Sequence, residues 1–250
     1  MTPTPKTLYV HDDLTGDVDE RFGADSDAAR AARALLALVG RDVTRTRILT
    51  LEEQLAVVAR GHQRPFAAAI GIARAGERVA RQIHARTGWF PRIERVAVAR
   101  EECEDGYVLS TLGQPPLAEQ LAPVLGDGSI AVVDDTIFSG LTMLAVLRAL
   151  PPAALARTHA FCLRAVGVSL AEVGRLCPVS AGFVAEGRLL DDVSFINASG
   201  LVQRGAIRRA GQSPLAFYER PEWMRAWFLE DAEEVTARCA ALARVLGQAA

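Results

Sequence analysis

Between residues 66 and 165 the sequence alternates short apolar stretches with amphipathic ones, and this alternation constrains the fold more than any other feature. The apolar stretches have the length of strands, and the amphipathic stretches place apolar residues at helical spacing. Strands that alternate with helices indicate a parallel sheet with right-handed crossovers. The sequence therefore predicts an α/β fold, an open and mostly parallel sheet with flanking helices. The predicted strands are 66–72, 92–100, 129–134 and 157–165, and the predicted helices between them are 76–87, 117–126 and 139–152.

Outside residues 66–165 the boundaries of helices, strands and domains are less clear from the sequence. Residues 1–25 are polar and rich in Asp and Gly, which is typical of a loosely ordered arm with a short strand at TLYV. Two helices are predicted next, one from the N-cap Ser26 to Gly40 and one from the N-cap Thr50 to Gly61. Residues 101–117 read as a polar loop, and 228–247 as a terminal amphipathic helix. We expect three parts, namely an arm (1–25), an α/β core (26–181) and a small C-terminal hood lobe with the terminal helix (182–250).

Composition excludes several classes of protein. The net charge of −2 provides no basic field for nucleic acid or for an acidic membrane surface. No apolar run approaches the roughly 18 residues of a membrane span, and the first residues lack the pattern of a signal peptide. The four cysteines form no C-x-x-C pair, which argues against a zinc site or a disulfide framework. We expect a cytoplasmic protein with free thiols.

The segment 129–143, SIAVVDDTIFSGLTM, points to a ligand. An apolar run ends in two adjacent aspartates, Asp134 and Asp135, and a turn with Gly140 then leads into a predicted helix. In open α/β sheets, ligands bind beyond the carboxyl ends of the strands. Successive backbone N–H groups and a helix N-terminus, together with hydroxyl donors, form a cradle for a phosphate. The hydroxyl donors are Thr136, Ser139 and Thr142.

The paired carboxylates suggest the rest of that ligand. They cannot bind a bare phosphate, but they suit vicinal hydroxyls, or a divalent cation between them and the ligand. A phosphate beside a diol describes ribose 5-phosphate. The chain has neither the G-x-x-x-x-G-K-[ST] nor the G-x-G-x-x-G pattern of other nucleotide sites. The alternative is a strand-to-helix connection without a ligand, for which two buried carboxylates would be costly.

Residues 130–142, IAVVDDTIFSGLT, resemble the 5-phosphoribosyl 1-pyrophosphate (PRPP) motif of type I phosphoribosyltransferases at every defining position. The resemblance implies a pentosyl transferase of nucleotide metabolism that moves ribose 5-phosphate from PRPP to a nitrogenous, nucleobase-like acceptor and releases pyrophosphate. It implies Mg²⁺ as cofactor and catalytic roles for Asp134 and Asp135. These two would hold the ribose 2- and 3-hydroxyls and contact the metal only indirectly, with Asp135 also a candidate acid or base near the acceptor. The 5-phosphate would bind the segment 136–142, which we call the cradle segment: Thr136, Ile137, Phe138, Ser139, Gly140, Leu141 and Thr142.

Two earlier segments resemble the pyrophosphate site and the mobile loop of that family. In AAAIGIARAGERVARQI the small residues allow close backbone approach, although Gly71 and Gly76 would also serve strand–helix packing. The segment 100–114 takes the place of a loop with an R-K-x-x-K-x-x-G pattern, but Glu101 and either Glu104 or Cys103 replace its two lysines. An acidic loop repels pyrophosphate unless a cation intervenes. The pyrophosphate would therefore bind Ala73, Arg74, Ala75, Gly76 and Arg100.

The C-terminal segment resembles a poorly characterised subgroup linked to bacterial stress and tellurite-resistance clusters. It supplies two candidate acceptor contacts, Phe183 for stacking and Asn197 for hydrogen bonding. Three arginines there either bind phosphate or pair with nearby carboxylates: Arg188, Arg204 and Arg208. The implied partners are small molecules, namely PRPP and a base-like acceptor, with no nucleic acid and no membrane, and a homodimer is left open.

Two other functions compete with the transferase. A regulator that senses PRPP or a nucleotide without catalysis would tolerate the loss of the loop lysines. A phosphohydrolase with paired aspartates would need the D-x-D spacing, whereas Asp134 and Asp135 are adjacent. The acceptor itself cannot be read from the sequence.

Overall fold

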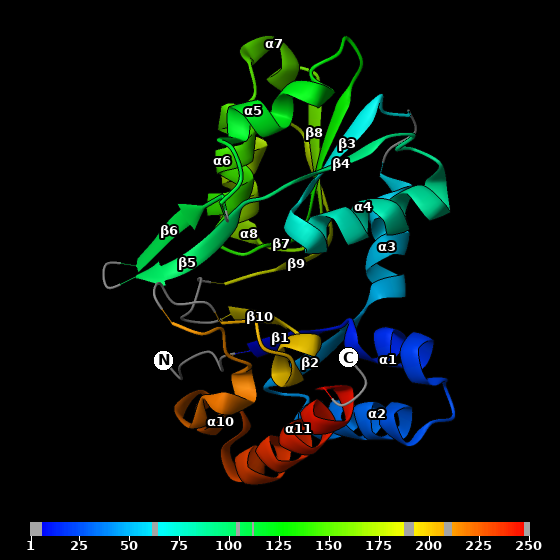
Figure 1. Ribbon diagram of the computed structural model, residues 1–250, viewed down its shortest axis with the longest axis vertical. Coiled ribbons are helices and arrows are strands. Elements are labelled where there is room, and N and C mark those ends of the chain that lie inside the picture. Colours follow the sequence, from blue (N-terminus) through cyan, green and yellow to red (C-terminus); the bar gives the residue numbers. More distant parts are fainter. Residues whose placement is uncertain are drawn as a thin grey trace. The chain divides into compact units, whose positions relative to one another are not determined.

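The computed structural model describes residues 7–61, 65–103, 106–111, 113–187, 193–207 and 212–247. The chain forms two compact units (Figure 1). Unit 1 combines residues 1–51 with 190–250, and unit 2 is the continuous segment 52–189. Unit 2 is therefore inserted in the sequence of unit 1, whereas we expected the boundaries near residues 25 and 181.

Unit 2 contains a five-stranded sheet in which every neighbouring pair is parallel, in the order β4-β3-β7-β8-β9. This confirms the predicted α/β class and its mostly parallel sheet. The last strand was not predicted, because its sequence VSAGFVA lies in a region without clear periodicity. The five strands are β3 (Ala68–Ile72), β4 (Ile93–Val96), β7 (Ile130–Ile137), β8 (Thr158–Val166) and β9 (Val179–Ala185).

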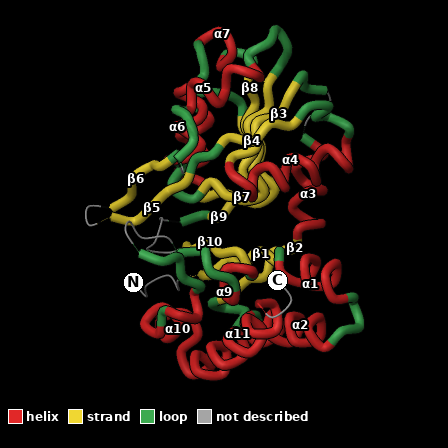
Figure 2. Tube along the Cα trace, viewed as in Figure 1, coloured by secondary structure: helices red, strands yellow, loops and turns green. Residues whose placement is uncertain are grey.

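Helices cover both faces of this sheet (Figure 2). On one face lies α4 (Ala73–Thr87), whose Val79, Ala80 and Ile83 are buried. On the other face the buried side chains of the strands join those of three helices in one hydrophobic core. These are α5 (Leu117–Leu121), α6 (Leu141–Ala149) and α8 (Gly167–Gly174). The remaining helices of unit 2 are α3 (Leu51–Arg60), the 3₁₀ turn η1 (Ala122–Val124) and α7 (Pro152–Leu155).

An antiparallel hairpin replaces the polar loop that we expected over 101–117. It consists of β5 (Ala99–Cys103) and β6 (Gly106–Ser110) and forms a separate two-stranded sheet. The strand expected over 92–100 is accordingly divided between β4 and β5. Tyr107, Val108 and Leu109 are residue types that favour strands, but the acidic residues just before them led us to expect a polar loop.

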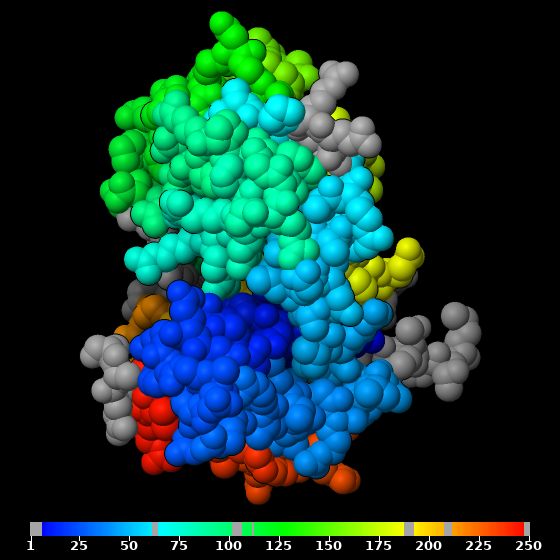
Figure 3. Space-filling view, turned by 90° about the vertical axis from the view of Figure 1, so that its right-hand side faces the viewer, coloured from blue at the N-terminus to red at the C-terminus, as the bar shows by residue number. Residues whose placement is uncertain are grey.

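Unit 1 contains a three-stranded parallel sheet in the order β10-β1-β2. The strands are β1 (Thr7–Asp12), β2 (Thr46–Thr50) and β10 (Val193–Asn197). The helices include α1 (Leu14–Phe22), α2 (Asp27–Val39) and α11 (Ala232–Gly247), and α2 packs against α11. Figure 3 shows these first residues, in blue, beside the last ones, in orange and red. The shorter helices are α9 (Ser199–Val202), η2 (Phe217–Glu219), α10 (Pro221–Phe228) and η3 (Leu229–Asp231).

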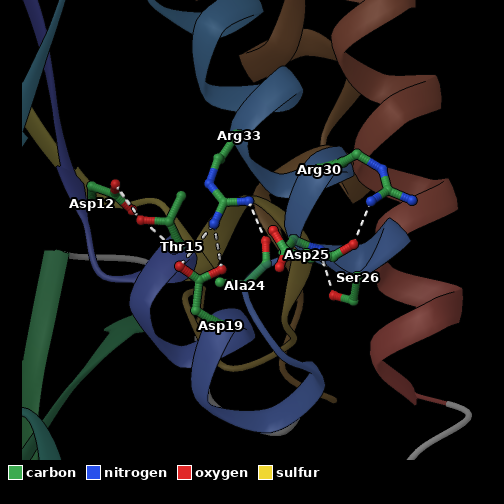
Figure 4. A network of polar contacts seen from close by, with 9 residues as sticks. Asp12, Thr15, Asp19, Ala24, Asp25, Ser26, Arg30 and Arg33 are labelled. Carbon is green, nitrogen blue, oxygen red and sulfur yellow. Dashed lines mark hydrogen bonds and ion pairs between the residues drawn. The ribbon is translucent and has the colours of Figure 1, made fainter.

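The short strand expected at TLYV is confirmed by β1, but the loosely ordered arm around it is wrong for its described part. Leu8, Val10 and Leu14 are fully buried in the core of unit 1. Polar contacts also order the segment that follows (Figure 4). Asp12 accepts hydrogen bonds from the backbone N–H and the hydroxyl of Thr15, and Arg33 contacts Asp19 at 2.9 Å. These residues belong with the C-terminal part because β1 pairs with β10.

Two smaller predictions concern the helix ends and the thiols. Ser26 caps α2 by accepting a hydrogen bond from the Ala29 N–H, as its sequence pattern predicted. Cys162, Cys177 and Cys239 are buried and free, and the side chain of Cys103 lies outside the described part. Within the described residues, no helix combines the length and the hydropathy needed to cross a bilayer.

Candidate functional site

The two aspartates lie on the central strand of unit 2 and not beyond it. We expected the strand to end at Asp134, but β7 continues to Ile137. The reason is β8, which keeps pairing with β7 through Thr136↔Arg164 and Ile137↔Ala165. Asp134 and Asp135 are thus held by a regular ladder at the carboxyl edge of the sheet, where open α/β folds bind ligands.

Asp134 is the more buried of the two, with 8% of its surface exposed. Its Oδ1 accepts a hydrogen bond of 2.8 Å from the backbone N–H of Asp135. Burial raises the pKa of Asp134 well above its ordinary value, and the neighbouring charge of Asp135 raises it further. Asp134 therefore retains its proton more readily than an exposed carboxyl does.

Asp135 has a cationic neighbour that the sequence analysis missed. The Nη2 of Arg164 lies 3.3 Å from its Oδ2, and the Arg164 side chain is only 1% exposed. A buried guanidinium is costly unless a carboxylate accompanies it, and Asp135 supplies that carboxylate. Arg164 interrupts the apolar run of β8, AFCLRAV, and a charge inside such a run was the available signal.

The cradle segment joins β7 to α6 through a turn. Gly140 has a φ of +76°, in the left-handed region that favours glycine. A Cβ built on Gly140 would make only ordinary van der Waals contacts. Glycine is therefore favoured here by the backbone conformation and not by a lack of space. No side chain caps α6, which leaves its first N–H groups available to an anion.

The first turn of α8 supports this turn from the side. The Ser169 hydroxyl donates a hydrogen bond of 2.6 Å to the carbonyl of Phe138, and Ser169 is buried. Sequence reasoning also missed this residue, because a single serine at the start of a helix carries no specific signal. Its effect is to fix the backbone on which Ser139 and Gly140 lie.

Arg100 contacts the cradle segment directly. Its Nη1 donates a hydrogen bond of 3.0 Å to the Ser139 hydroxyl. Its guanidinium carbon lies 4.6 Å from the ring centroid of Tyr107 and 5.8 Å from that of Phe138. The residue that we assigned to pyrophosphate thus lies at the cradle segment.

The segment Ala73–Gly76 is the first turn of α4 and not a loop before it. Ala73 has a φ of +52°, an unusual value for a residue with a Cβ. A Cβ on Gly76 would lie 2.3 Å from the Val133 carbonyl oxygen and 3.3 Å from the Cα of Asp134. A Cβ on Gly71 would similarly meet the backbone of Glu77 at 2.4 Å.

Both glycines are therefore explained by the close packing of α4 on β3 and β7. The same packing brings the start of α4 beside the aspartate pair. Arg74 in this first turn is exposed, and Ala75 is partly buried. The structure thus gathers Ala73–Gly76, Asp134, Asp135 and the cradle segment at one edge of the sheet.

The two candidate acceptor residues lie in different units. Phe183 lies on β9 in unit 2, partly buried and in register with Arg164. Asn197 lies on β10 in unit 1, in register with His11. In unit 1, Arg204 is bound by Glu219, whose Oε1 lies 2.9 Å from its Nε. Arg188 and Arg208 lie outside the described residues.

The aspartate pair alone does not form a metal site. In the described part of the chain, no three His, Cys, Asp or Glu side chains are placed to hold a metal ion together. Asp134 accepts a backbone N–H and Asp135 faces Arg164, so both carboxylates already have partners. The indirect metal role that the sequence predicted for this pair stays a prediction.

Comparison with known proteins gives structural but not sequence neighbours. No protein-family model matches the chain, and no curated protein matches its sequence. A hypothetical protein from Neisseria gonorrhoeae with bound ppGpp is 18% identical, with a TM-score of 0.40 over 59% of this chain and 85% of the other. The purine phosphoribosyltransferase from Pyrococcus horikoshii Ot3 is 15% identical, with a TM-score of 0.34 over 75% and 92%.

The APRTase from Giardia lamblia complexed with 9-deazaadenine is also similar, with 14% identity and a TM-score of 0.34 over 69% of this chain and 85% of that one. Similarity at this level does not assign an activity to the chain. What the fold and the site define by themselves is an α/β protein with a carboxylate pair, and with a glycine-containing turn before an uncapped helix, at the carboxyl edge of a parallel sheet.

Proposed function

We propose that the chain is a phosphoribosyltransferase that transfers ribose 5-phosphate from PRPP to a nitrogenous, nucleobase-like acceptor and releases pyrophosphate. One observation carries this proposal. A carboxylate pair on a buried central strand is followed within a few residues by a turn with a left-handed Gly140 and an uncapped helix N-terminus. The first feature suits a sugar diol and the second suits a phosphate, and ribose 5-phosphate carries both groups.

The cradle segment would anchor the 5-phosphate. The N–H groups at the start of α6 and the hydroxyls of Ser139 and Thr142 are donors without charge of their own, and the helix dipole favours an anion. Binding energy at the phosphate is remote from C1 of the ribose, where the bond breaks. It would therefore orient the reacting carbon without a direct part in the chemistry.

The aspartates would hold the ribose hydroxyls in two different ways. Asp135, paired with Arg164, would accept a hydrogen bond and place negative charge near the ring as it becomes an oxocarbenium ion. Asp134, whose pKa is raised by burial, is able to donate a hydrogen bond as a neutral acid. Bound Mg²⁺ would stabilise the departing pyrophosphate.

The pyrophosphate would bind at the start of α4, where Arg74 is exposed. Helix N-termini attract anions, and Ala73–Gly76 lie beside the backbone of Asp134. The proposed reaction therefore uses two helix N-termini at one edge of the sheet, one for each phosphate-bearing end of PRPP. A cytoplasmic location, a homodimer and the link to the stress-associated subgroup remain predictions from the sequence.

One observation favours a second candidate, a regulator that binds PRPP without turning it over. The hairpin β5–β6 carries the acidic sequence REECED where related enzymes carry lysines. Loss of those cations would weaken catalysis more than it weakens substrate binding. The experiment below separates the two candidates because it measures turnover and binding together.

The test is pyrophosphate release from PRPP and Mg²⁺ with a panel of free bases, combined with calorimetric binding of PRPP. We expect release with at least one base, and a loss of roughly 100-fold or more in D134N/D135N, because the diol loses the negative charge of Asp135 and the carboxyl group of Asp134. The exposed Asp127 supplies the matched control D127N, which should keep full turnover.

If the chain binds PRPP but releases pyrophosphate with none of the bases, the regulator is the correct candidate and the enzyme is not. If the wild-type chain neither binds nor releases, both candidates fail. Normal turnover by a folded D134N/D135N variant would show that the aspartates do not hold the sugar.

A further inference from the structure

Arg100 is the residue whose position departs most from the sequence prediction. It lies on β5 of the hairpin, 39 residues before Ser139, yet its Nη1 donates to the Ser139 hydroxyl at 3.0 Å. Tyr107 on β6 and Phe138 in the cradle segment lie beside its guanidinium as aromatic neighbours. Three groups from two segments therefore fix this side chain against the cradle segment.

The hydrogen bond has a direction that matters for a ligand. A serine hydroxyl has one proton to donate and two lone pairs that accept. Because Arg100 only donates, Ser139 uses a lone pair in this contact and its own proton remains free. The hydroxyl and the other N–H groups of the guanidinium are then available to the same anion, in an arrangement that suits a phosphate.

Charge also points to Arg100. The cradle segment TIFSGLT contains no charged side chain. Arg164, the nearby buried cation, faces Asp135. In the described part of the chain, the ion pairs found do not include Arg100, whose contacts are a hydroxyl and two aromatic rings. A phosphate monoester in the cradle would supply the negative charge that is missing beside this guanidinium.

We propose that Arg100 is a ligand of the 5-phosphate and not of the pyrophosphate, and that it ties the β5–β6 hairpin to the phosphate-loaded cradle segment. The inference deepens the proposed function and depends on it for the identity of the sugar phosphate. Arg100 would supply a positive charge to a cradle segment that has no charged side chain of its own. The acidic hairpin is then attached through the phosphate end of the substrate, away from the leaving group.

The experiment uses the full chain and isothermal titration calorimetry with two probes, ribose 5-phosphate and magnesium pyrophosphate. R100Q removes the charge but keeps a side chain that can donate to Ser139, and R100K keeps a positive charge. We expect R100Q to bind ribose 5-phosphate roughly tenfold more weakly, with R100K closer to the wild type. Affinity for magnesium pyrophosphate should be unchanged in both variants.

The matched control is R92Q. Arg92 is a half-exposed arginine that pairs with Glu94 and the Pro123 carbonyl, away from the cradle segment. The R92Q variant should bind ribose 5-phosphate and magnesium pyrophosphate as the wild type does. Circular dichroism should show native folding for all variants.

Two results would overturn the assignment of Arg100. If R100Q loses affinity for pyrophosphate and keeps it for ribose 5-phosphate, Arg100 serves the leaving group as the sequence predicted. If R100Q binds ribose 5-phosphate more tightly, Arg100 blocks the cradle. Failure of the wild type to bind ribose 5-phosphate or PRPP would instead contradict the proposed function itself.

Discussion

At the scale of single residues, Asp134 and Asp135 are chain neighbours in different electrostatic surroundings. Asp134 is buried and hydrogen-bonded to a backbone N–H, and its pKa is raised. Asp135 is more exposed and faces a buried guanidinium. Two carboxyl groups that differ in this way can act as a donor and as a charged acceptor at the same ligand.

The raised pKa of Asp134 has a cost in stability. An unfolded aspartate has a pKa of about 3.9. Above that value the folded state binds more protons than the unfolded state until Asp134 itself ionises, so the free energy of unfolding falls as pH rises through this range. Because Asn cannot ionise and can still accept the Asp135 N–H, D134N should be more stable than the wild type at pH 7.

We expect the melting temperature of D134N to exceed that of the wild type at pH 7, by about 2–4 °C for each kcal/mol gained. The difference should shrink at pH 4, where the wild-type carboxyl is neutral. Thermal melts of the ligand-free wild type and D134N at pH 7 and pH 4 measure this difference. The variant D127N, at an exposed aspartate, is the control. If D134N raises the melting temperature at pH 4 as much as at pH 7 or more, ionisation of Asp134 does not destabilise the folded chain.

At the scale of elements, the junction of β3, α4 and β7 determines how closely the start of α4 approaches the aspartates. Gly71 and Gly76 are the points of contact, since a Cβ on either would collide with backbone atoms. Ala73 at the start of the helix adopts a left-handed φ that costs an L-residue about 1 kcal/mol or more. Such strain is common where the chain is shaped for a ligand.

The close approach at Gly76 gives a direct test. The variant G76A places a methyl group 2.3 Å from the Val133 carbonyl oxygen, so helix or strand must move. We expect a loss of about 1–3 kcal/mol in the free energy of unfolding, measured by urea denaturation. Because Val133 precedes Asp134, affinity for PRPP should fall as well.

G126A is the control for this prediction. Gly126 lies in a turn of the same unit, and nothing lies within 4 Å of a Cβ built there. This variant should be neutral or slightly stabilising. If G76A is as stable as G126A, α4 does not pack on β7 as tightly as described.

At the scale of the whole molecule, two hydrophobic cores belong to two units. One core consists of buried residues from β1, α1, α2, β10 and α11, and the other of residues from β3, β7, β8 and their helices. The entire candidate site at the carboxyl edge of the larger sheet lies within unit 2. Unit 2 should therefore fold and bind the sugar phosphate without the rest of the chain.

The fragment 52–189 tests this expectation. It contains all five parallel strands and the helices on both faces of their sheet. We expect cooperative thermal unfolding and an affinity for ribose 5-phosphate within about threefold of the full chain, since a separate core supports the site. A fragment that remains unfolded would show that the inserted unit depends on unit 1.

The sequence predicts four strands of the larger sheet because apolar stretches alternate with amphipathic ones, although the hairpin β5–β6 lies between β4 and α5. It does not predict the smaller sheet, whose partners lie far apart, as with Thr7 and Val193. At the site, the aspartates and the cradle segment follow from one contiguous motif. Arg164 and the contact of Arg100 with Ser139 depend on pairing between segments about 30–40 residues apart, which no local pattern encodes.

The path of the chain has a consequence for biosynthesis. Strand β1 leaves the ribosome before unit 2, but its partner β10 and the packing helix α11 are translated after the whole of unit 2. At about 5–20 residues per second, the opening segment waits some tens of seconds for its core. A nascent or prematurely terminated chain would therefore display the apolar face of α2 to chaperones and proteases while the inserted unit is already complete.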